Sequence, residues 1–328
     1  MMLNLLQQLE VQPVLVDVGA AGAPPAAWEP IAPQSVYVGF DPEPAGDETA
    51  ALARYARAIR IERAVAPLPD ATTLPLYLTR LRCCSSTLKP RSAALAEHLF
   101  APLFEVERET TIEAVSLGDA LANQGLQRAD WLKVDSQGID LRIYQSLPDA
   151  LRRTVLALDI EPGLIDAYEG EDLFADAHTA LTADGFWLTD LELHGTPRIR
   201  QTTLEHLQRL QPALTAERLQ HGLRVSPGWC NARYLRSPAW LREQSATAAE
   251  YALLGCFALL DRQPGFALDV ALACRGCYGV EPLSDHLHDE AVRRLLAQCA
   301  AQQPARQPRR WWRGLTQRAG ELVHALLS

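Results

Sequence analysis

The first two thirds of the chain alternates short apolar runs with stretches of helical spacing. The runs are four to seven residues long and are bounded by Gly, Pro, Asp or charged helices. This alternation predicts an α/β fold with a mostly parallel, Rossmann-like sheet and helices on both faces, because parallel strands need a crossover between them. The expected strands cover residues 14–18, 35–40, 59–65, 131–134, 155–160 and 186–191.

Three further segments have strand character. Segments 74–79 and 104–116 lie between the third and fourth runs, and their alternation of β-branched and charged residues predicts an inserted hairpin or an edge pairing. A last strand is expected over 231–236. Residues 74–116 are therefore predicted to form an extended insertion within the α/β domain.

The character of the chain changes after Pro238, where Ala, Leu, Gln and Arg dominate. Helical spacing predicts helices over 247–260, 289–301 and 311–327, with a linker rich in Pro and Gln at 302–308. Since the change falls near Ser237, we expect a main domain over 1–237, a helical extension over 238–303, and a separate helix in 304–328.

Composition bounds the class of protein. The chain has 328 residues, 48% of them hydrophobic, which is enough to bury one large core or two modest ones. Its net charge of -9 argues against nucleic acid as a partner, because phosphates must be neutralised by Lys and Arg. No run approaches the roughly 18 apolar residues of a spanning helix, and no basic leader precedes one, so we expect a cytoplasmic protein. The seven cysteines include the neighbours Cys83 and Cys84, which favours reduced thiols.

The C-terminal segment departs from this acidic balance. Residues 304–328 hold five arginines and one glutamate, a net charge of +4, and place an apolar stripe along one helical face. A basic amphipathic helix over 309–327 suits peripheral contact with the inner face of an anionic membrane. It equally suits docking on its own domain or on a second copy of the chain.

One short segment contains side chains that can bind zinc. Cys274 and Cys277 form a CxxC pair, and His286 and His288 follow. The spacing matches no known finger, and two small thiols on a helix are the simpler interpretation. We therefore predict no metal site.

A turn of small residues follows the first strand. Asp17 lies near the end of this strand, and Gly19, Ala20 and Gly22 let a ligand approach the backbone closely. Asp41 ends the second strand, 24 residues after Asp17, where an acidic side chain can accept both hydroxyls of a ribose.

The turn lacks the dinucleotide fingerprint G-x-G-x-x-G, which would need glycines where Ala21 and Pro24 stand. A pyrophosphate cradle is therefore not expected. S-adenosylmethionine (SAM) has no phosphate and presents a carboxylate, an ammonium and a sulfonium, so it suits this turn better. An ordinary βα turn without a ligand is the alternative.

Four carboxylates are expected at the carboxyl ends of strands, where open parallel sheets bind ligands. They are Asp17, Asp41, Asp135 and Glu161. Asp135 and Glu161 end neighbouring strands, so one can act as general base while the other orients an acceptor, or both can ligate a divalent cation. Alternatively, Asp135 caps the following helix and Glu161 is solvated.

Two histidines are further candidates for the base. His98 and His194 can both exchange protons near neutral pH. Each one alone is more often structural, so they rank below the carboxylates.

Five segments, in order and spacing, resemble the FkbM-type methyltransferases over about residues 14–236. The segments are LVDVGAAGAPPAAWEPIAPQSVYVGFDPEP, LYLTRLRCCSSTLKP, SLGDAL, DWLKVDSQGIDLRIYQS and LALDIEPGLIDAYEGEDLFADAHTALTADGFWLTDL. The resemblance implies a SAM-dependent O-methyltransferase of the class I, Rossmann-like type. Its acceptor would be a hydroxyl of a sugar, a glycan or a small natural product such as a polyketide.

The resemblance also implies roles for individual residues. In the cofactor site, Asp17, Gly19, Ala20 and Gly22 would line the methionine end of SAM and Asp41 would hold the ribose. Over the site and beside the transferring methyl group would lie Ser85, Ser86, Asp135 and Gln137. The chain departs from the family pattern at 116–119 and 161–163, which bears on the acceptor pocket more than on the cofactor site.

Two other classes of function remain open from the sequence. A catalytically idle Rossmann-like module, recruited by its C-terminal helices to a glycan-assembly complex or a membrane, would bind SAM without turnover. A nucleotide-sugar or nicotinamide enzyme would need a phosphate-binding turn, which the missing glycines argue against.

Overall fold

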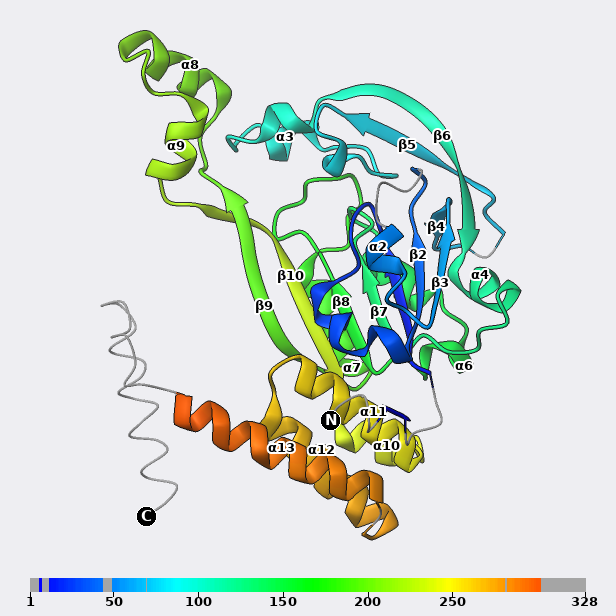
Figure 1. Ribbon diagram of the computed structural model, residues 1–328. Coiled ribbons are helices and arrows are strands. Elements are labelled where there is room, and N and C mark those ends of the chain that lie inside the picture. The colour runs from blue at the N-terminus through cyan, green and yellow to red at the C-terminus, as the bar shows by residue number, and fades with distance from the viewer. Residues whose placement is uncertain (1–5, 8–11, 44–48, 69, 281, 302–328) are drawn as a thin grey trace.

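The computed structural model describes residues 6–7, 12–43, 49–68, 70–280 and 282–301. The main feature is a seven-stranded sheet with the strand order β3-β2-β1-β7-β8-β10-β9 (Figure 1). Its strands are β1 (Val14–Val18), β2 (Val36–Phe40), β3 (Arg57–Ile61), β7 (Trp131–Val134), β8 (Ala157–Ile160), β9 (Phe186–Thr196) and β10 (Ser226–Arg236). The first five in spatial order pair in parallel, whereas β10 is antiparallel to both β8 and β9. The predicted α/β class with a mostly parallel sheet is confirmed, and the arrangement is consistent with a Rossmann-like fold.

The strand order determines where a ligand can bind. From β1 the chain proceeds to β2 and β3 on one side, and then returns to β7 and β8 on the other. The direction of progression therefore reverses between β1 and β7. In open α/β sheets a crevice forms outside the carboxyl ends of the strands at such a reversal.

Three predicted strands differ by more than two residues from those observed, and one of them is β9, which continues to Thr196 instead of ending at 191. The segment predicted over 59–65 is divided into β3 and a separate short strand, β4 (Ala64–Ala66). The exposed, charged Glu62 and Arg63 separate them, and the Arg63 amide donates to the Ile61 carbonyl at 2.8 Å in a tight turn. The last strand begins at Ser226 rather than at 231 and passes through a register shift between Pro227 and Trp229. Its first residues were not predicted as a strand because Pro227 and Gly228 are uncommon within strands.

The predicted insertion forms a small sheet of its own. Strands β5 (Thr73–Thr79) and β6 (Val106–Ser116) are antiparallel, as expected of a hairpin, and β4 pairs in parallel with β6. Three short helices lie between β5 and β6, namely η2 (Arg82–Cys84), α3 (Ser92–Leu95) and η3 (Ala101–Phe104). In Figure 1 the insertion covers the upper end of the main sheet.

Helices cover both faces of the main sheet. One face packs against α4 (Leu117–Asn123), α5 (Asp140–Gln145) and α7 (Phe174–Ala183), and the other packs against η1 (Ala26–Gln34) and α11 (Ala248–Leu260). Strand β1 serves both cores, since Leu15 faces one and Val16 the other. η1 is a 3-10 helix because it contains Pro30 and Pro33, which cannot donate the bonds of an α-helix. The remaining short helices of this region are α2 (Thr49–Leu52) and α6 (Asp149–Arg152).

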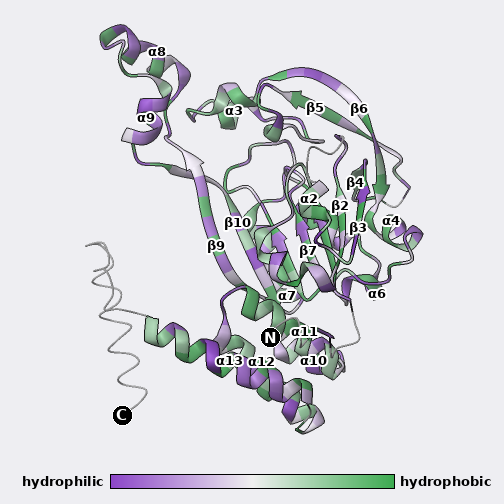
Figure 2. Cartoon of the chain, viewed as in Figure 1, coloured by the Kyte–Doolittle hydropathy of each residue, from purple (hydrophilic) through white to green (hydrophobic). Residues whose placement is uncertain are grey.

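The region after residue 237 is a layer of the same domain. It contains α10 (Pro238–Glu243), α11, α12 (Pro264–Tyr278) and α13 (Pro282–Ala301). Residues 251–259 of α11 are all buried, and Phe257 contacts Trp131 of β7 with a ring centroid separation of 5.0 Å. The predicted helix 247–260 is confirmed, and 289–301 is the second part of α13, whose mixed hydropathy in Figure 2 fits its outer position. The boundary predicted near Ser237 marks the start of α10, which the Ser237 hydroxyl caps at 3.1 Å.

An arm of two helices projects from the molecule. α8 (Gln201–Leu210) and α9 (Ala216–Gly222) lie between β9 and β10, and Figure 1 shows them beyond the end of this long hairpin. The predicted linker 302–308 and helix 311–327 lie outside the described residues. In the described part of the chain, no helix is both long enough and apolar enough to cross a membrane.

Candidate active site

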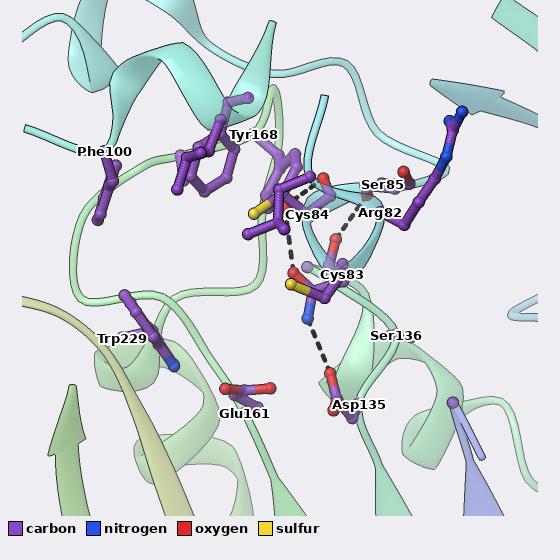
Figure 3. A pocket seen from close by; sticks show the side chains of 18 of the residues that line it. Arg82, Cys83, Cys84, Ser85, Phe100, Asp135, Ser136, Glu161, Tyr168 and Trp229 are labelled. Atoms are coloured by element: carbon purple, nitrogen blue, oxygen red, sulfur yellow. Dashed lines mark hydrogen bonds between the residues drawn. The ribbon is translucent and has the colours of Figure 1, made fainter. Parts of the chain in front are cut away.

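A cavity of about 1250 Å³ opens at the carboxyl edge of the main sheet, under the insertion. Its lining includes Gly19 after β1, Asp41 after β2, Asp135 after β7 and Glu161 after β8. Three of the four strand-end carboxylates predicted from the sequence therefore converge on one cavity, at the reversal of the strand order. Figure 3 shows Asp135 and Glu161 on one side, with residues of the insertion facing them.

The turn after β1 requires glycine at position 19. Gly19 has φ +81°, a conformation that other residues rarely adopt, and a Cβ there would lie 2.1 Å from the Asp135 carbonyl oxygen. The amides of Gly19 and Ala20 both donate to the Phe40 carbonyl, at 3.0 and 2.9 Å. The turn is therefore fixed between β2 and β7.

The same turn offers few donors to a phosphate. The amides of Gly19 and Ala20 are already engaged, and Pro24 and Pro25 have no amide hydrogen to donate, which leaves the amides of residues 21–23. The element that follows is a 3-10 helix that begins at Ala26, so no α-helix N-terminus faces the cavity here. A pyrophosphate would therefore find fewer donors than a glycine loop followed by an α-helix usually gives it.

Asp17 lies behind the turn rather than in the cavity. Its carboxylate is 2% exposed, lies 2.9 Å from the Lys133 Nζ, and accepts a hydrogen bond from the Tyr37 hydroxyl at 3.2 Å. Burial raises the pKa of Asp17, and the Lys133 ammonium opposes that rise. Ala20 is buried, Gly22 is exposed, and neither contributes to the cavity lining.

The other residues implied by the family resemblance do line the cavity: Asp41, Ser85, Ser86 and Gln137. Asp41 is nearly buried, and that burial raises its pKa, although one carboxylate oxygen accepts the Glu43 amide at 2.8 Å. The two serines fix the loop that follows η2.

A chain of hydrogen bonds ties Asp135 to this loop. The Gln137 side-chain amide donates to Asp135 Oδ1 at 2.8 Å. The Tyr168 hydroxyl has one proton to donate, and two acceptors lie within reach of it: Gln137 Oε1 at 3.1 Å and the Cys84 carbonyl at 2.9 Å. Gln137 has φ +58°, and the Ser86 hydroxyl holds its carbonyl at 2.6 Å. A strained residue supported in this way is typical of a functional site.

Asp135 and Glu161 form a carboxyl pair. Burial, the neighbouring Asp135 carboxylate and its hydrogen bond, and Asp140 raise the pKa of Glu161 to about 9. Glu161 therefore holds a proton at neutral pH. The Lys133 Nζ lies 4.0 Å from Asp135 Oδ2.

Asp140 fixes the spacing of this pair. Its buried carboxylate accepts the Ser136 amide at 2.9 Å and the Glu161 amide at 2.8 Å, so it joins the ends of β7 and β8. Burial raises the pKa of Asp140 to about 6. Asp140 is the first residue of α5, where acidic residues are common because they interact favourably with the helix dipole. Its position in the sequence therefore did not indicate that it joins the two strand ends.

The structure argues against the two structural alternatives for the candidate catalytic residues, whose catalytic roles stay predictions. Asp135 does not cap α5, whose N-cap is Ile139 and has no side-chain cap. Glu161 is half-buried and paired rather than freely solvated. Both observations favour the functional interpretation.

The remaining candidates lie away from the cavity. His98 is buried and stacks on Phe100, and His194 contacts Asn231, so neither lines the cavity. Cys274 and Cys277 lie on α12, and all seven cysteines are free. Within the described ranges, no three His, Cys, Asp or Glu side chains gather to hold a metal ion.

Several residues that line the cavity could not be recognised from the sequence pattern. Phe100 immediately precedes η3 and Phe104 ends it, Tyr168 and Glu171 follow β8, and Trp229 lies on β10. Burial raises the pKa of Glu171 to about 7, while its carboxylate accepts the amides of residues 167 and 168. These residues meet only because separate segments fold over the same strand ends.

Comparison with protein-family models, with the curated proteins and with solved structures gives no match. The likeness to FkbM-type methyltransferases therefore remains a prediction from sequence. The case for function rests on the geometry of the cavity and on its charge.

The carboxyl pair predicts how stability depends on pH. Raised pKa values in the folded state mean that folding retains protons which the unfolded chain releases above about pH 4.5, so stability falls as pH rises through the folded values. We expect the melting temperature of the wild type to fall from pH 6 to pH 9. The melting temperature of Glu161→Gln should fall less, because glutamine has no proton that the unfolded chain would release in this range. Glu243→Gln, at an exposed position of α10 away from the cavity, serves as the control. Parallel decreases for Glu161→Gln and the wild type would contradict the assignment.

Proposed function

We propose that the chain is a SAM-dependent O-methyltransferase that acts on a hydroxyl of a sugar, a glycan or a related natural product. The observation that carries the proposal is the cavity at the strand-order reversal. There, three strand-end carboxylates meet beside a glycine turn that offers few donors to a phosphate. This combination favours an adenosine cofactor without phosphates over a dinucleotide.

The charge of the cavity supports a cationic cofactor. Among the described residues, six acids line it against the arginines Arg63 and Arg82: Asp41, Glu43, Asp135, Glu161, Glu171 and Glu217. Because Glu161 holds a proton, the other five acids supply the negative charge. When bound, SAM supplies a methyl group on a positively charged sulfonium. Asp41 is placed to accept the ribose hydroxyls, and the backbone at Gly19 allows close approach.

The carboxyl pair can manage the proton of an acceptor hydroxyl. With Glu161 protonated, the pair carries one negative charge and has one place left for a proton. Asp135 is oriented by Gln137 and can take the hydroxyl proton as the oxygen attacks. In Figure 3 the indole nitrogen of Trp229 points toward Glu161, on the side where an acceptor oxygen would lie.

The test is methyl transfer from SAM labelled in its methyl group to a pool of hydroxyl compounds, with the full chain. We expect Asp135→Asn to lower kcat about a hundredfold or more, because the general base is lost, with little change in SAM affinity. Asp176→Asn, an exposed position in the first turn of α7, is the matched control. Labelled product formed equally fast by Asp135→Asn would contradict the role, and SAM binding without any product would favour the idle module.

A further inference from the structure

We propose that the acceptor hydroxyl is carried on an extended apolar body, either a hydrophobic chain or a flat ring system, rather than on a bare sugar. The inference rests on the proposed function, and it concerns the part of the cavity away from the glycine turn. Three observations carry it: a band of aromatic rings, the engagement of the polar groups beside that band, and the position of the carboxyl pair.

Four aromatic side chains form a continuous band along the cavity. Ring centroids are 5.7 Å apart between Tyr168 and Phe104, 5.1 Å between Phe104 and Phe100, and 6.1 Å between Phe100 and Trp229. All four residues line the cavity. They come from η3 and the residue before it, from the loop after β8 and from β10, so three separate segments combine to build one apolar wall.

The rings keep part of their surface open to the cavity. Phe100, Phe104 and Trp229 are only half-buried, although each packs on another ring. Further apolar side chains extend the wall at both ends, namely Leu99, Pro102, Leu103, Ile165 and Leu204. Apolar surface of this extent gains free energy when an apolar ligand removes it from water.

Polar groups beside the band already bind one another. The Thr196 hydroxyl donates to Gln220 Oε1 at 2.7 Å, and the Tyr168 hydroxyl is engaged by Gln137 and Cys84. The Glu171 carboxylate accepts two backbone amides. A monosaccharide against this wall would give up hydrogen bonds to water at several hydroxyls without finding replacements.

The carboxyl pair lies beside the Trp229 end of the band, and Gln137 also connects Asp135 to the Tyr168 hydroxyl. Figure 3 shows Glu161 and Asp135 below Trp229 and Phe100, with the indole nitrogen nearest to Glu161. A single hydroxyl at this end would meet groups that can hold and deprotonate it. The rest of the acceptor would then extend along the rings, which defines a hydrophobic alcohol or phenol as the substrate class.

Isothermal titration of the full chain with simple probes tests this class without SAM. We expect 1-octanol to bind about fifteenfold more tightly than 1-hexanol, which is about fourfold for each added methylene. 2-Naphthol binding more tightly than 1-octanol would assign a flat ring, and the reverse order would assign a chain. Methyl galactoside binding more tightly than both, or equal affinity for the two alkanols, would overturn the proposal.

Variants locate the binding. Phe104→Gln is expected to weaken 1-octanol binding about tenfold or more, with Phe100→Gln as a second variant if the first does not fold. Leu272→Gln, which replaces a leucine half exposed on α12, should leave the affinity unchanged. Unchanged affinity in a folded Phe104 or Phe100 variant would overturn the assignment. SAM affinity is measured separately, so failure of the cofactor site would be distinguished from failure of the apolar site.

Discussion

Replacing Gly19 with alanine should both lower the free energy of unfolding of the domain and abolish SAM binding. The positive φ of Gly19 costs an alanine about 1–2 kcal/mol. In addition, its Cβ would lie 2.1 Å from the Asp135 carbonyl oxygen, so the turn would have to move away from β7. We expect the free energy of unfolding to fall by about 3 kcal/mol in denaturant titration. Titration calorimetry should detect no SAM binding.

Gly22→Ala is the matched control in the same turn. Gly22 has no positive φ, and no atom lies within 4 Å of a Cβ added there. Its free energy of unfolding should change by less than about 0.5 kcal/mol, and SAM should still bind. Equal effects of the two substitutions would show that the close approach at Gly19 does not shape the cofactor site.

Arg236→Leu is expected to be the most destabilising change far from the cavity. The guanidinium of Arg236 is 1% exposed and lies between the rings of Phe186, at 3.7 Å, and Trp240, at 3.9 Å. It donates to the Val155 carbonyl at 3.0 Å and to the Tyr144 hydroxyl at 2.9 Å. Leucine would leave these buried groups without a donor, so stability should fall by about 3–5 kcal/mol.

Two comparisons separate the causes of this loss. Arg236→Lys keeps the positive charge, but its single ammonium cannot reach both the Val155 carbonyl and the Tyr144 hydroxyl. Its loss of stability should be smaller than that of Arg236→Leu but more than half as large. Arg242→Leu, at an exposed position of α10, should change the melting temperature little. A melting temperature of Arg236→Leu within a few degrees of the wild type would contradict the structural role.

Much of the fold could be predicted from the hydrophobic pattern. Strands such as β1 and β7 lie in the middle of the sheet and are apolar apart from one residue each, Asp17 and Lys133, so residues 14–18 and 131–134 were located to the residue. The ends of β9 and β10 were missed because this hairpin extends beyond the core. There its side chains are exposed or polar, and alternation no longer reports burial.

The helical layer shows another limit of sequence reasoning. α11 is apolar on all sides because it lies between the sheet and the outer helices, and this pattern was recognised as a helix. Its place in the core of the main domain was not predicted. Contacts between Trp131 and Phe257 join residues far apart in the chain, and no local pattern encodes them.

The site was predictable only in part for a similar reason. Asp41, Asp135 and Glu161 follow strands, so the topology alone brings them together. The aromatic band and Asp140 depend on loops and on tertiary contacts. Asp17 has the sequence position of a ligand-binding acid, yet the neighbouring Lys133 and Tyr37 bind its carboxylate behind the turn.

Calorimetric titration of the full chain with SAM and, separately, with NAD tests the central claim most directly. We predict micromolar affinity for SAM, no binding of NAD, and a loss of about tenfold or more in SAM affinity for Asp41→Ala, because a charged acceptor of the ribose hydroxyls is removed. Asp176→Ala should bind SAM as the wild type does. NAD binding in place of SAM, or SAM binding that is unchanged by Asp41→Ala, would contradict the account.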